Sequence, residues 1–171
     1  WNKDNLVDPN TGFVWDGINR LGDGKIDYDW EYTYCQGVFI GAAIELYRIT
    51  GDMMYINDAI RTAEFALKRF VDPESGMLPD EGKDDCGLFK GIFVRYLYEL
   101  VKMRPDLHSI RRMLVHNATV MWDSGRNERG LISRAWKGKV EPVVQLCAQL
   151  SGVMLLEMVA LLDPDPGRIS E

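Results

Sequence analysis

Residues that build metal centres and disulfide frameworks are scarce in this 171-residue sequence, which has two histidines and three cysteines. Cys35, Cys86 and Cys147 lie far apart and no Cys-x-x-Cys pair occurs, so neither a zinc site nor a disulfide framework is predicted. His108 and His116 fall on one predicted water-facing helix without a third ligand, which predicts surface residues and no metal site.

Long apolar runs and several catalytic motifs are also missing. No uncharged apolar stretch approaches the ~20 residues of a membrane-spanning helix, which argues against a membrane protein. The 20 basic and 26 acidic side chains give a net charge of −6, which argues against nucleic-acid binding. Gly-x-Ser-x-Gly, a phosphate-binding glycine-rich loop and a Cys–His nucleophile arrangement are absent. The sequence starts at Trp1 rather than Met, so we expect a signal or a larger N-terminal part ahead of it.

The sequence does contain enough apolar material for one domain with a sizeable core, because 46% of its residues are hydrophobic. Residues 1–34 are rich in Gly, Asp and Asn, and the string from Leu21 to Gly24 is typical of a turn. We expect a long ordered loop there, with a short strand around Phe13-Val14-Trp15.

Helical spacing begins at Tyr34. Apolar residues between Val38 and Tyr47 form a broad surface, which predicts a helix buried on more than one side. Thr50-Gly51 ends that helix, and Asp52 is predicted to be the N-cap of the next one. The second helix has a narrower apolar stripe, and its other face is predicted to meet water through Asp58, Arg61, Glu64 and Lys68.

This pair of helices recurs along the chain. The string Gly37–Ile40 aligns with Gly91–Val94, and at the same interval Glu45-Leu46 aligns with Glu99-Leu100. A third apolar helix is predicted from Val143 to Leu162, ending at Asp163-Pro164. Helical pairs repeated roughly every fifty residues indicate stacked hairpins, in either an α-solenoid or an α/α toroid.

The loops favour the toroid. Residues 71–85 and 123–142 form long polar connections ahead of the second and third apolar helices. Loops that lead into the inner helices of a toroid line one rim of its central cleft, and long polar loops are where a scaffold carries function.

The string from Asn19 to Trp30 is similar to a calcium-binding EF-hand loop, but its register fails. Leu21 occupies the third position, where an oxygen ligand is needed, and Trp30 occupies the twelfth, where a bidentate Glu is needed. The sequence therefore predicts an acidic turn without calcium.

Aromatic residues gather ahead of the first apolar helix and alternate with carboxylates. Sugar rings stack on aromatic planes while carboxylates accept hydrogen bonds from sugar hydroxyls, so this pattern suits a carbohydrate site. Packing of the loop onto the helices is the alternative. The aromatic residues are Trp15, Tyr28, Trp30, Tyr32 and Tyr34, and the acids are Asp16, Asp27, Asp29 and Glu31.

Two consecutive aspartates, Asp84-Asp85, directly precede the second apolar helix. Adjacent carboxylates can divide the work of a glycosidase, provided that their surroundings separate their pKa values. Acids at a helix N-terminus also serve as caps and as partners of the helix dipole. The capping role is favoured by the sequence.

Four strings together resemble one known family. Leu6–Asp8, Val14–Ile18, Tyr32–Gly41 and Gly87–Leu97 are similar to the C-terminal half of glycoside hydrolase family 76, the endo-α-1,6-mannanases. The resemblance implies an all-α chain of stacked helical hairpins that forms about half of an (α/α)6 toroid. Residues 1–171 are then the C-terminal part of one domain, with a cleft loop at 1–34 and hairpins at 35–171. Cys35 departs from the family, which usually has Asn there.

The resemblance also implies where the catalytic residues lie. The family's catalytic carboxylates are two consecutive aspartates in a Trp-Trp-Asp-Asp-Met-like motif of the N-terminal half. This chain lacks that motif, and Met121-Trp122-Asp123 is only a partial match. Asp84-Asp85 belongs to a different family motif, so we expect no catalytic residue in this chain. The family's reaction retains configuration and implies no metal or organic cofactor.

The resemblance assigns the chain to the substrate side of the cleft. Asp16 matches an acid expected to bind sugar, and the amide of Gln36 is expected to hold a mannosyl hydroxyl. The repeated Glu45 and Glu99 are interpreted as structural, each bonding a neighbouring loop or helix end. The complete set of expected substrate-binding residues is Asp16, Tyr34, Gln36, Asp85, Phe89 and Lys90.

The predicted function is hydrolysis of α-1,6-mannosidic bonds, with a mannan-like polysaccharide as substrate. The alternative is a helical-repeat or mannan-binding module without catalysis, and a sugar epimerase on the same toroid would need histidines in the cleft. Expected protein partners are the N-terminal half of the domain or a second copy, through exposed helices. One sequon, Asn117-Ala118-Thr119, leaves the compartment open, with a secreted or cell-surface location favoured.

Overall fold

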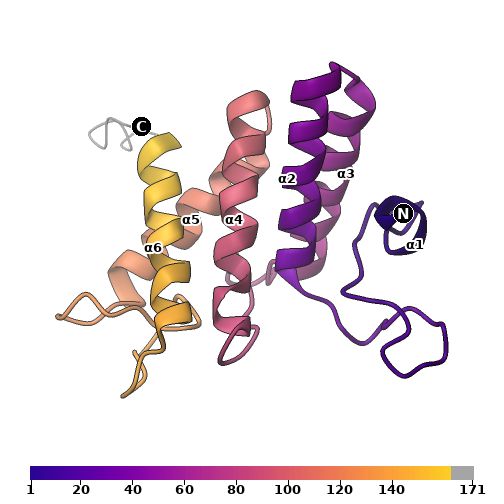
Figure 1. Cartoon of the computed structure of the whole chain (residues 1–171). Coiled ribbons are helices and arrows are strands. Elements are labelled where there is room, and N and C mark those ends of the chain that lie inside the picture. Colours follow the sequence, from indigo (N-terminus) through magenta and orange to yellow (C-terminus); the bar gives the residue numbers. More distant parts are fainter. Residues whose placement is uncertain (163–171) are drawn as a thin grey trace.

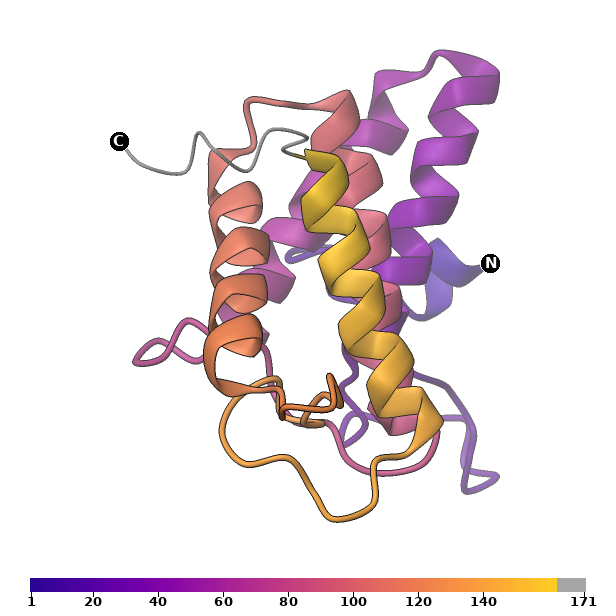
Figure 2. The same ribbon diagram turned by 90° about the vertical axis from the view of Figure 1, so that its left-hand side faces the viewer.

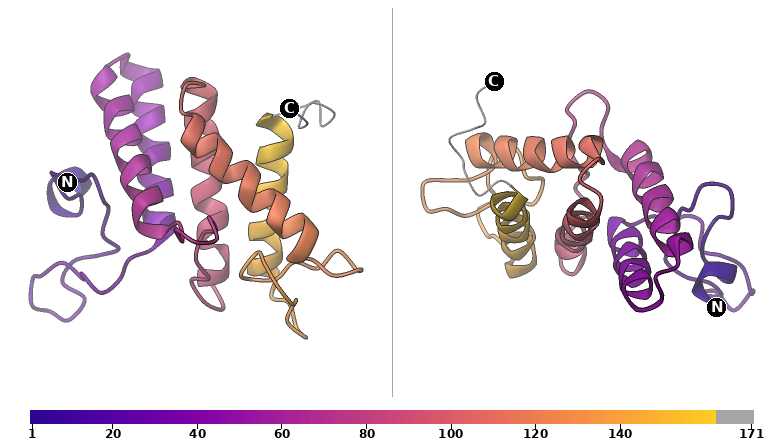
Figure 3. Two further views of the ribbon diagram at one scale, coloured as in Figure 1. Left: turned by 180° about the vertical axis from the view of Figure 1, so that it is seen from behind. Right: turned by 90° about the horizontal axis from the view of Figure 1, so that it is seen from above.

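A computed structural model describes residues 1–162 and shows helices arranged in two layers (Figure 1). One layer holds α2 (Thr33–Thr50), α4 (Cys86–Met103) and α6 (Leu146–Leu162), which run parallel. The other holds α3 (Met53–Phe70) and α5 (His108–Ser124), as the view from above shows (Figure 3). The short α1 (Asn2–Asn5) lies beside the long N-terminal loop. The predicted all-α stack of hairpins is confirmed.

Two boundary predictions differ from the structure. The third apolar helix begins at Leu146 rather than Val143, and its predicted end at Asp163-Pro164 lies outside the described residues. The strand expected around Phe13-Val14-Trp15 is wrong, because Val14 makes only an isolated antiparallel bridge to Val7. No strand occurs within residues 1–162.

Glycines let the three parallel helices approach closely. A Cβ added to Gly37 on α2 would lie 2.8 Å from the Cα of Phe93 on α4. A Cβ added to Gly91 on α4 would lie 2.7 Å from the Cα of Ser151 on α6. The core fills the space between the two layers, with Phe93 and Leu97 of α4 fully buried near its centre. α4 therefore occupies the middle of the row and is flanked by α2 and α6.

The outer helix α3 has the predicted cap, and its predicted water-facing side is confirmed at Glu64 and Lys68 but not at Asp58. Asp52 accepts a hydrogen bond from the backbone N–H of Met54 at 2.8 Å, which confirms it as N-cap. Asp58 is buried, because the N-terminal segment covers it and Lys3 donates to its carboxylate at 2.5 Å. Arg61 donates to the same carboxylate at 3.1 Å. The water-facing position predicted for Asp58 is therefore wrong.

The two end helices of the row leave apolar side chains uncovered. On α2, Val38 and Ile49 are 49% and 80% exposed, so the predicted burial on more than one side does not extend to this face. On α6, Leu146 and Leu161 are 72% and 61% exposed. Within residues 1–162, no helix combines the length and the hydropathy needed to cross a membrane.

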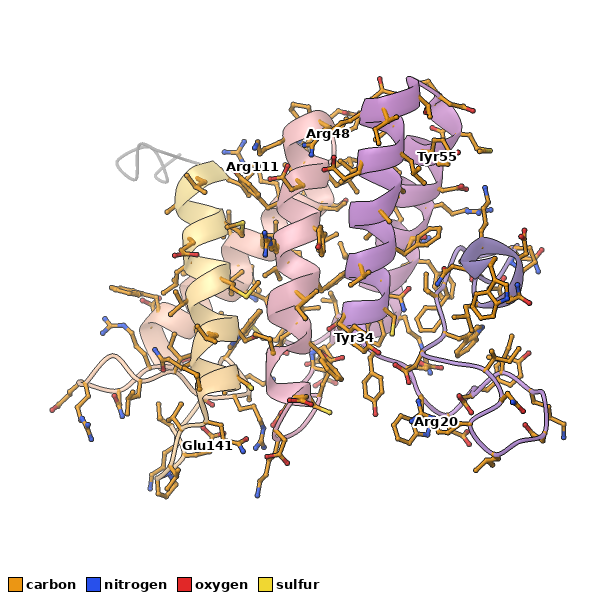
Figure 4. All side chains as sticks on the ribbon, viewed as in Figure 1. Arg20, Tyr34, Arg48, Tyr55, Arg111 and Glu141 are labelled. Atoms are coloured by element: carbon orange, nitrogen blue, oxygen red, sulfur yellow. The ribbon has the colours of Figure 1, made fainter. Side chains whose placement is uncertain are left out.

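A charged cluster joins α2 and α4 at their C-terminal ends. Arg48 donates to Glu99 at 2.9 Å and also to Glu45, and Figure 4 shows Arg48 at the upper end of these helices. The structural role predicted for the two glutamates fits these bonds, although their partner is a helical arginine and they lie on an open face. That face carries a pocket of about 550 Å³.

Candidate functional site

The candidate site lies at the ends where α2, α4 and α6 begin. The long loops 71–85 and 125–145 gather at this end (Figure 2), as does the N-terminal loop. Figure 4 shows Tyr34 at the lower end of α2, on the same side as Arg20 of the loop. The rim of long loops predicted from the sequence is therefore present.

Gln36 ties the N-terminal loop to α2. It is fully buried, and its amide nitrogen donates to the carbonyls of Val14 at 2.7 Å and Tyr32 at 3.2 Å. Its amide oxygen accepts from the backbone N–H of Val14 at 2.9 Å. Because these bonds occupy the amide and no solvent reaches it, the direct hydroxyl contact expected of Gln36 does not fit this geometry. Gln36 instead fixes the loop that carries Asp16.

Asp16 is the centre of a polar cluster. Its carboxylate accepts hydrogen bonds from the Tyr34 hydroxyl and from Arg20, and the thiol of Cys35 lies 3.6 Å away. The Asp16 side chain is 9% exposed. Burial, and secondly the hydrogen bond to Asp16, raise the pKa of Tyr34 above its usual range. Burial also raises the pKa of Cys35 to about 12, so the thiol stays protonated and can donate to Asp16.

Four aromatic side chains form a continuous surface beside Asp16, here called the aromatic platform: Trp30, Tyr32, Tyr34 and Phe89. The Phe89 ring centroid lies 4.4 Å from that of Tyr34 and 5.0 Å from that of Tyr32. The Tyr32 and Trp30 centroids are 5.9 Å apart. The Arg20 guanidinium lies 3.7 Å from the centroid of the Trp30 ring. Trp30 is 41% exposed.

Trp15 serves packing, as the alternative interpretation of the sequence pattern predicted, whereas Tyr28 is 60% exposed. Trp15 lies 4.7 Å from Phe13, which in turn packs on Phe65 of α3 at 5.9 Å. Residues 13 to 16 thus alternate, with Phe13 packing toward α3 and Val14 and Asp16 bonded to α2.

Lys90 follows Phe89 on α4, but its side chain points away from the aromatic platform to which Phe89 belongs. Lys90 is 2% exposed, donates to the carbonyl of Pro79 at 3.1 Å and lies 4.5 Å over the ring of Trp136. Burial lowers the pKa of Lys90 to about 8. Lys90, which was expected to bind substrate, therefore lies buried beneath the aromatic platform.

The adjacent acids Asp84 and Asp85 are exposed where α4 begins. Asp85 is the N-cap residue of α4, as favoured, but its side chain makes no capping hydrogen bond. The backbone carbonyls of Asp84 and Asp85 accept from the N–H groups of Gly87 and Leu88 at 3.0 Å. The Asp84 carboxylate accepts from Gln145, the residue before α6, at 2.7 Å.

Glu81 is the residue that sequence reasoning missed. Its carboxylate accepts from the backbone N–H of Thr33 at 2.7 Å and from the Thr33 hydroxyl at 2.5 Å. Burial raises the pKa of Glu81 to about 7. Next to it, Arg134 donates to Asp80 at 2.7 and 2.9 Å. No local spacing relates Glu81 to Thr33, so only the tertiary structure reveals the contact.

A separate pocket lies among the loops at this end of the molecule, and the described residues offer no metal cluster. A pocket of about 470 Å³ lies between Lys83, Arg134 and the segment 141–148 that leads into α6. Among the described residues, no group of three or more His, Cys, Asp or Glu side chains is placed to hold a metal ion. In the acidic turn, Asp27 accepts from Arg20 at 3.4 Å.

Comparison with known proteins gives one family and several solved structures. The model described as glycosyl hydrolase family 76 matches residues 1–166. The Lin0763 protein from Listeria innocua is 40% identical with a TM-score of 0.89, covering 96% of this chain and 47% of that one. The GH76A α-1,6-mannanase from Salegentibacter sp. HEL1_6 is 42% identical with a TM-score of 0.85, covering 95% of this chain and 49% of that one.

An inactive variant of the Salegentibacter enzyme, in which two consecutive aspartates are replaced by alanine, was solved with an α-1,6-mannotetraose. It is 41% identical to this chain with a TM-score of 0.86, and 95% of this chain and 49% of that one are covered. The chain thus spans about half the length of the structures that it matches. No curated protein matches it.

Proposed function

The chain belongs to glycoside hydrolase family 76, and from that premise we propose that it supplies the substrate-binding side of a cleft in which α-1,6-mannosidic bonds are hydrolysed. The observation that carries the proposal is the aromatic platform beside Asp16, in a chain 42% identical to an α-1,6-mannanase. On this proposal residues 1–171 are the C-terminal part of one toroidal domain, with residues 1–34 as its cleft loop.

The platform and its polar border suit a sugar chain. The part of Trp30 that Arg20 leaves exposed can contact the C–H face of a mannosyl ring, as aromatic residues do in many ligand sites. Asp16 and Arg20 then offer a charged acceptor and a charged donor to hydroxyl groups at the edge of that ring. We assign direct contact to Asp16, Tyr34, Phe89 and the exposed Asp85, and support from beneath to Gln36 and Lys90.

Hydrolysis with retention needs two carboxyl groups, one to attack the anomeric carbon and one to protonate the leaving oxygen and then activate water. Both adjacent acid pairs are poorly suited: Asp80 and Glu81 are bonded to Arg134 and Thr33. In the pair Asp84-Asp85, Asp84 is bonded to Gln145 and has a left-handed backbone (φ 56°). We therefore assign the catalytic pair to the half of the family fold that this chain lacks. The proposed reaction uses no metal or organic cofactor.

The uncovered apolar faces of α2 and α6 are proposed contact surfaces for that other half. Burying apolar area is worth ~25 cal/mol per Å², so side chains such as Ile49 and Leu146 favour association. Without the other half, we expect the chain to self-associate through the same faces. A mannan-binding module without catalysis is the rival function, since the chain lacks the family's catalytic motif.

Replacing Asp16 tests the proposed site. The assembled enzyme is this chain mixed with the half of the Salegentibacter enzyme that it does not cover. In that assembly Asp16→Asn is expected to lower kcat/KM on α-1,6-mannotetraose about ten- to a hundredfold, because one charged hydrogen bond is worth ~1.5–3 kcal/mol. The measurement is initial-rate kinetics on the purified assembly.

Asp58→Asn is the matched control. Asp58 is another nearly buried carboxylate, with 12% of its side chain exposed, and it also binds an arginine. It lies on α3 away from the platform, so its replacement affects stability without lowering kcat/KM in the surviving folded enzyme. Equal losses in the two variants would remove Asp16 from the site.

A further inference from the structure

The start of α2 is held by a residue from another part of the chain. Tyr32 is the N-cap residue of α2 but its side chain makes no capping hydrogen bond. Glu81 makes that bond instead, from the loop between α3 and α4, at 2.7 Å to the Thr33 N–H. A helix N-terminus has unpaired N–H groups and a positive dipole end, and a carboxylate satisfies both.

The residue held by Glu81 lies inside the aromatic platform. Thr33 is the link between Tyr32 and Tyr34, and it is fully buried. Both of its donor groups, the backbone N–H and the hydroxyl, donate to Glu81. The two tyrosine rings pack on Phe89, and Tyr34 donates to Asp16. A shift of Thr33 would therefore move two platform rings and the hydroxyl that bonds Asp16.

Charged and titratable groups surround Glu81. From α4, the buried ammonium of Lys90 stabilises the ionised carboxylate, whereas Asp80 in the same loop destabilises it. The thiols of Cys35 and Cys86 and the phenol of Tyr32 also lie within reach of its charge. None of these groups donates a hydrogen bond to Glu81 among those found in the described residues, so Thr33 is its specific partner.

We propose that Glu81 is a positioning residue, which clamps Thr33 through two hydrogen bonds and thereby sets the aromatic platform against Asp16 for substrate binding. The link to substrate rests on the function proposed above, whereas the clamp itself does not. An ionised carboxylate accepts both Thr33 bonds with the help of its charge. A protonated acid or an amide has to donate to the Thr33 hydroxyl instead, and both of its bonds to Thr33 are then neutral and weaker.

This difference predicts a pH dependence. Below about pH 7 Glu81 gains a proton, so one of its two acceptor oxygens becomes a donor and the clamp weakens. Above pH 7 the carboxylate is ionised and accepts both bonds. In the Glu81→Gln variant the hydrogen bonds to Thr33 are weaker at every pH. The strength of the clamp should therefore not depend on pH in this variant.

Amide hydrogen exchange tests the clamp on the 171-residue chain itself. The Thr33 amide, corrected for intrinsic exchange, is expected to be about tenfold better protected at pH 8 than at pH 5.5. In Glu81→Gln the protection at pH 8 is expected to fall to the low-pH value. Thr33→Val, which has the same shape but no hydroxyl, should lose part of the protection, and should remain useful if Glu81→Gln folds poorly.

Glu31→Gln is the matched control, because Glu31 precedes Tyr32 but bonds Arg69 of α3 at 2.6 Å and not Thr33. It should leave the Thr33 protection and its pH dependence unchanged. In the assembled enzyme, Glu81→Gln is expected to raise KM for α-1,6-mannotetraose about tenfold at pH 8 with kcat unchanged.

The two failures are distinguishable. Thr33 protection that is independent of pH and unaltered in Glu81→Gln would overturn the clamp, whatever the assembly does with sugar. A pH-dependent clamp in a protein that neither binds nor cleaves α-1,6-mannotetraose would support the clamp, overturn its link to substrate and count against the proposed function. A loss of kcat with unchanged KM would overturn the positioning role.

Discussion

The 171-residue chain alone is expected to release no sugar from α-1,6-mannan, whereas the assembled enzyme is expected to cleave it. Glycosidases need two cooperating carboxyl groups, and their loss removes most of a rate enhancement that spans many orders of magnitude. In this chain Glu81 is committed to Thr33 and Asp16 to Tyr34 and Arg20. Asp80, next to Glu81, is bonded to Arg134, and the only consecutive aspartates, Asp84-Asp85, have one member bonded to Gln145.

The experiment is a reducing-sugar assay of each half alone and of the mixture. Mixing should restore turnover and should also convert any self-associated chain into a complex of the two halves, as measured by light scattering. Activity in this chain alone, abolished by Asp84→Asn or Asp85→Asn, would overturn both the proposed location of the catalytic pair and the role assigned to these acids. Sugar binding without turnover in the mixture would favour the binding-module alternative.

The second large effect concerns the glycines between the parallel helices. Gly37→Val and Gly91→Val are each expected to destabilise the fold by ~3 kcal/mol or more. An added Cβ would lie 2.8 Å and 2.7 Å from backbone Cα atoms of Phe93 and Ser151, and backbone cannot move aside as a flexible side chain can. The helices would have to separate, which would open the core around α4.

Ala42→Val on the exposed face of α2 is the control for this prediction. It introduces the same branched side chain where no close packing is lost, so its cost is limited to helix propensity, less than ~0.7 kcal/mol. Urea titration monitored by circular dichroism compares the variants with the unsubstituted chain. Free energies of unfolding for Gly37→Val and Gly91→Val that match Ala42→Val would show that the close approach is not needed.

Features set by local periodicity were predictable from the sequence. The repeated glycines and glutamates mark α2 and α4 as equivalent helices, and the apolar spacing of each is typical of a buried helix. Asp52 was predictable as an N-cap because its hydrogen-bond partner, the backbone N–H of Met54, is only two residues away. The family strings also located the loop that carries Asp16 and the start of α2 that carries Tyr34.

Features set by contacts between distant segments were not predictable. Gln36 reads as a substrate ligand by its motif, yet it binds Val14, 22 positions away, in a buried site. Asp58 reads as a solvent-facing acid until Lys3, 55 positions away, covers it. Glu81 caps a helix that begins 48 positions earlier. Burial of a polar residue depends on which segment packs over it, and a single sequence does not specify that.

Two matched tryptophans provide the most direct test that this chain binds mannan through the platform. Trp30 on the platform and Trp122 on the outer helix α5 are 41% and 52% exposed, and each has an arginine stacked on its ring, at 3.7 and 3.9 Å. The measurement is calorimetric titration of α-1,6-mannotetraose into the assembled enzyme, with its catalytic aspartates replaced so that the sugar persists. Trp30→Ala should weaken binding about tenfold or more, and Trp122→Ala should leave the Kd unchanged; equal affinities in the two variants would contradict a substrate site at the platform.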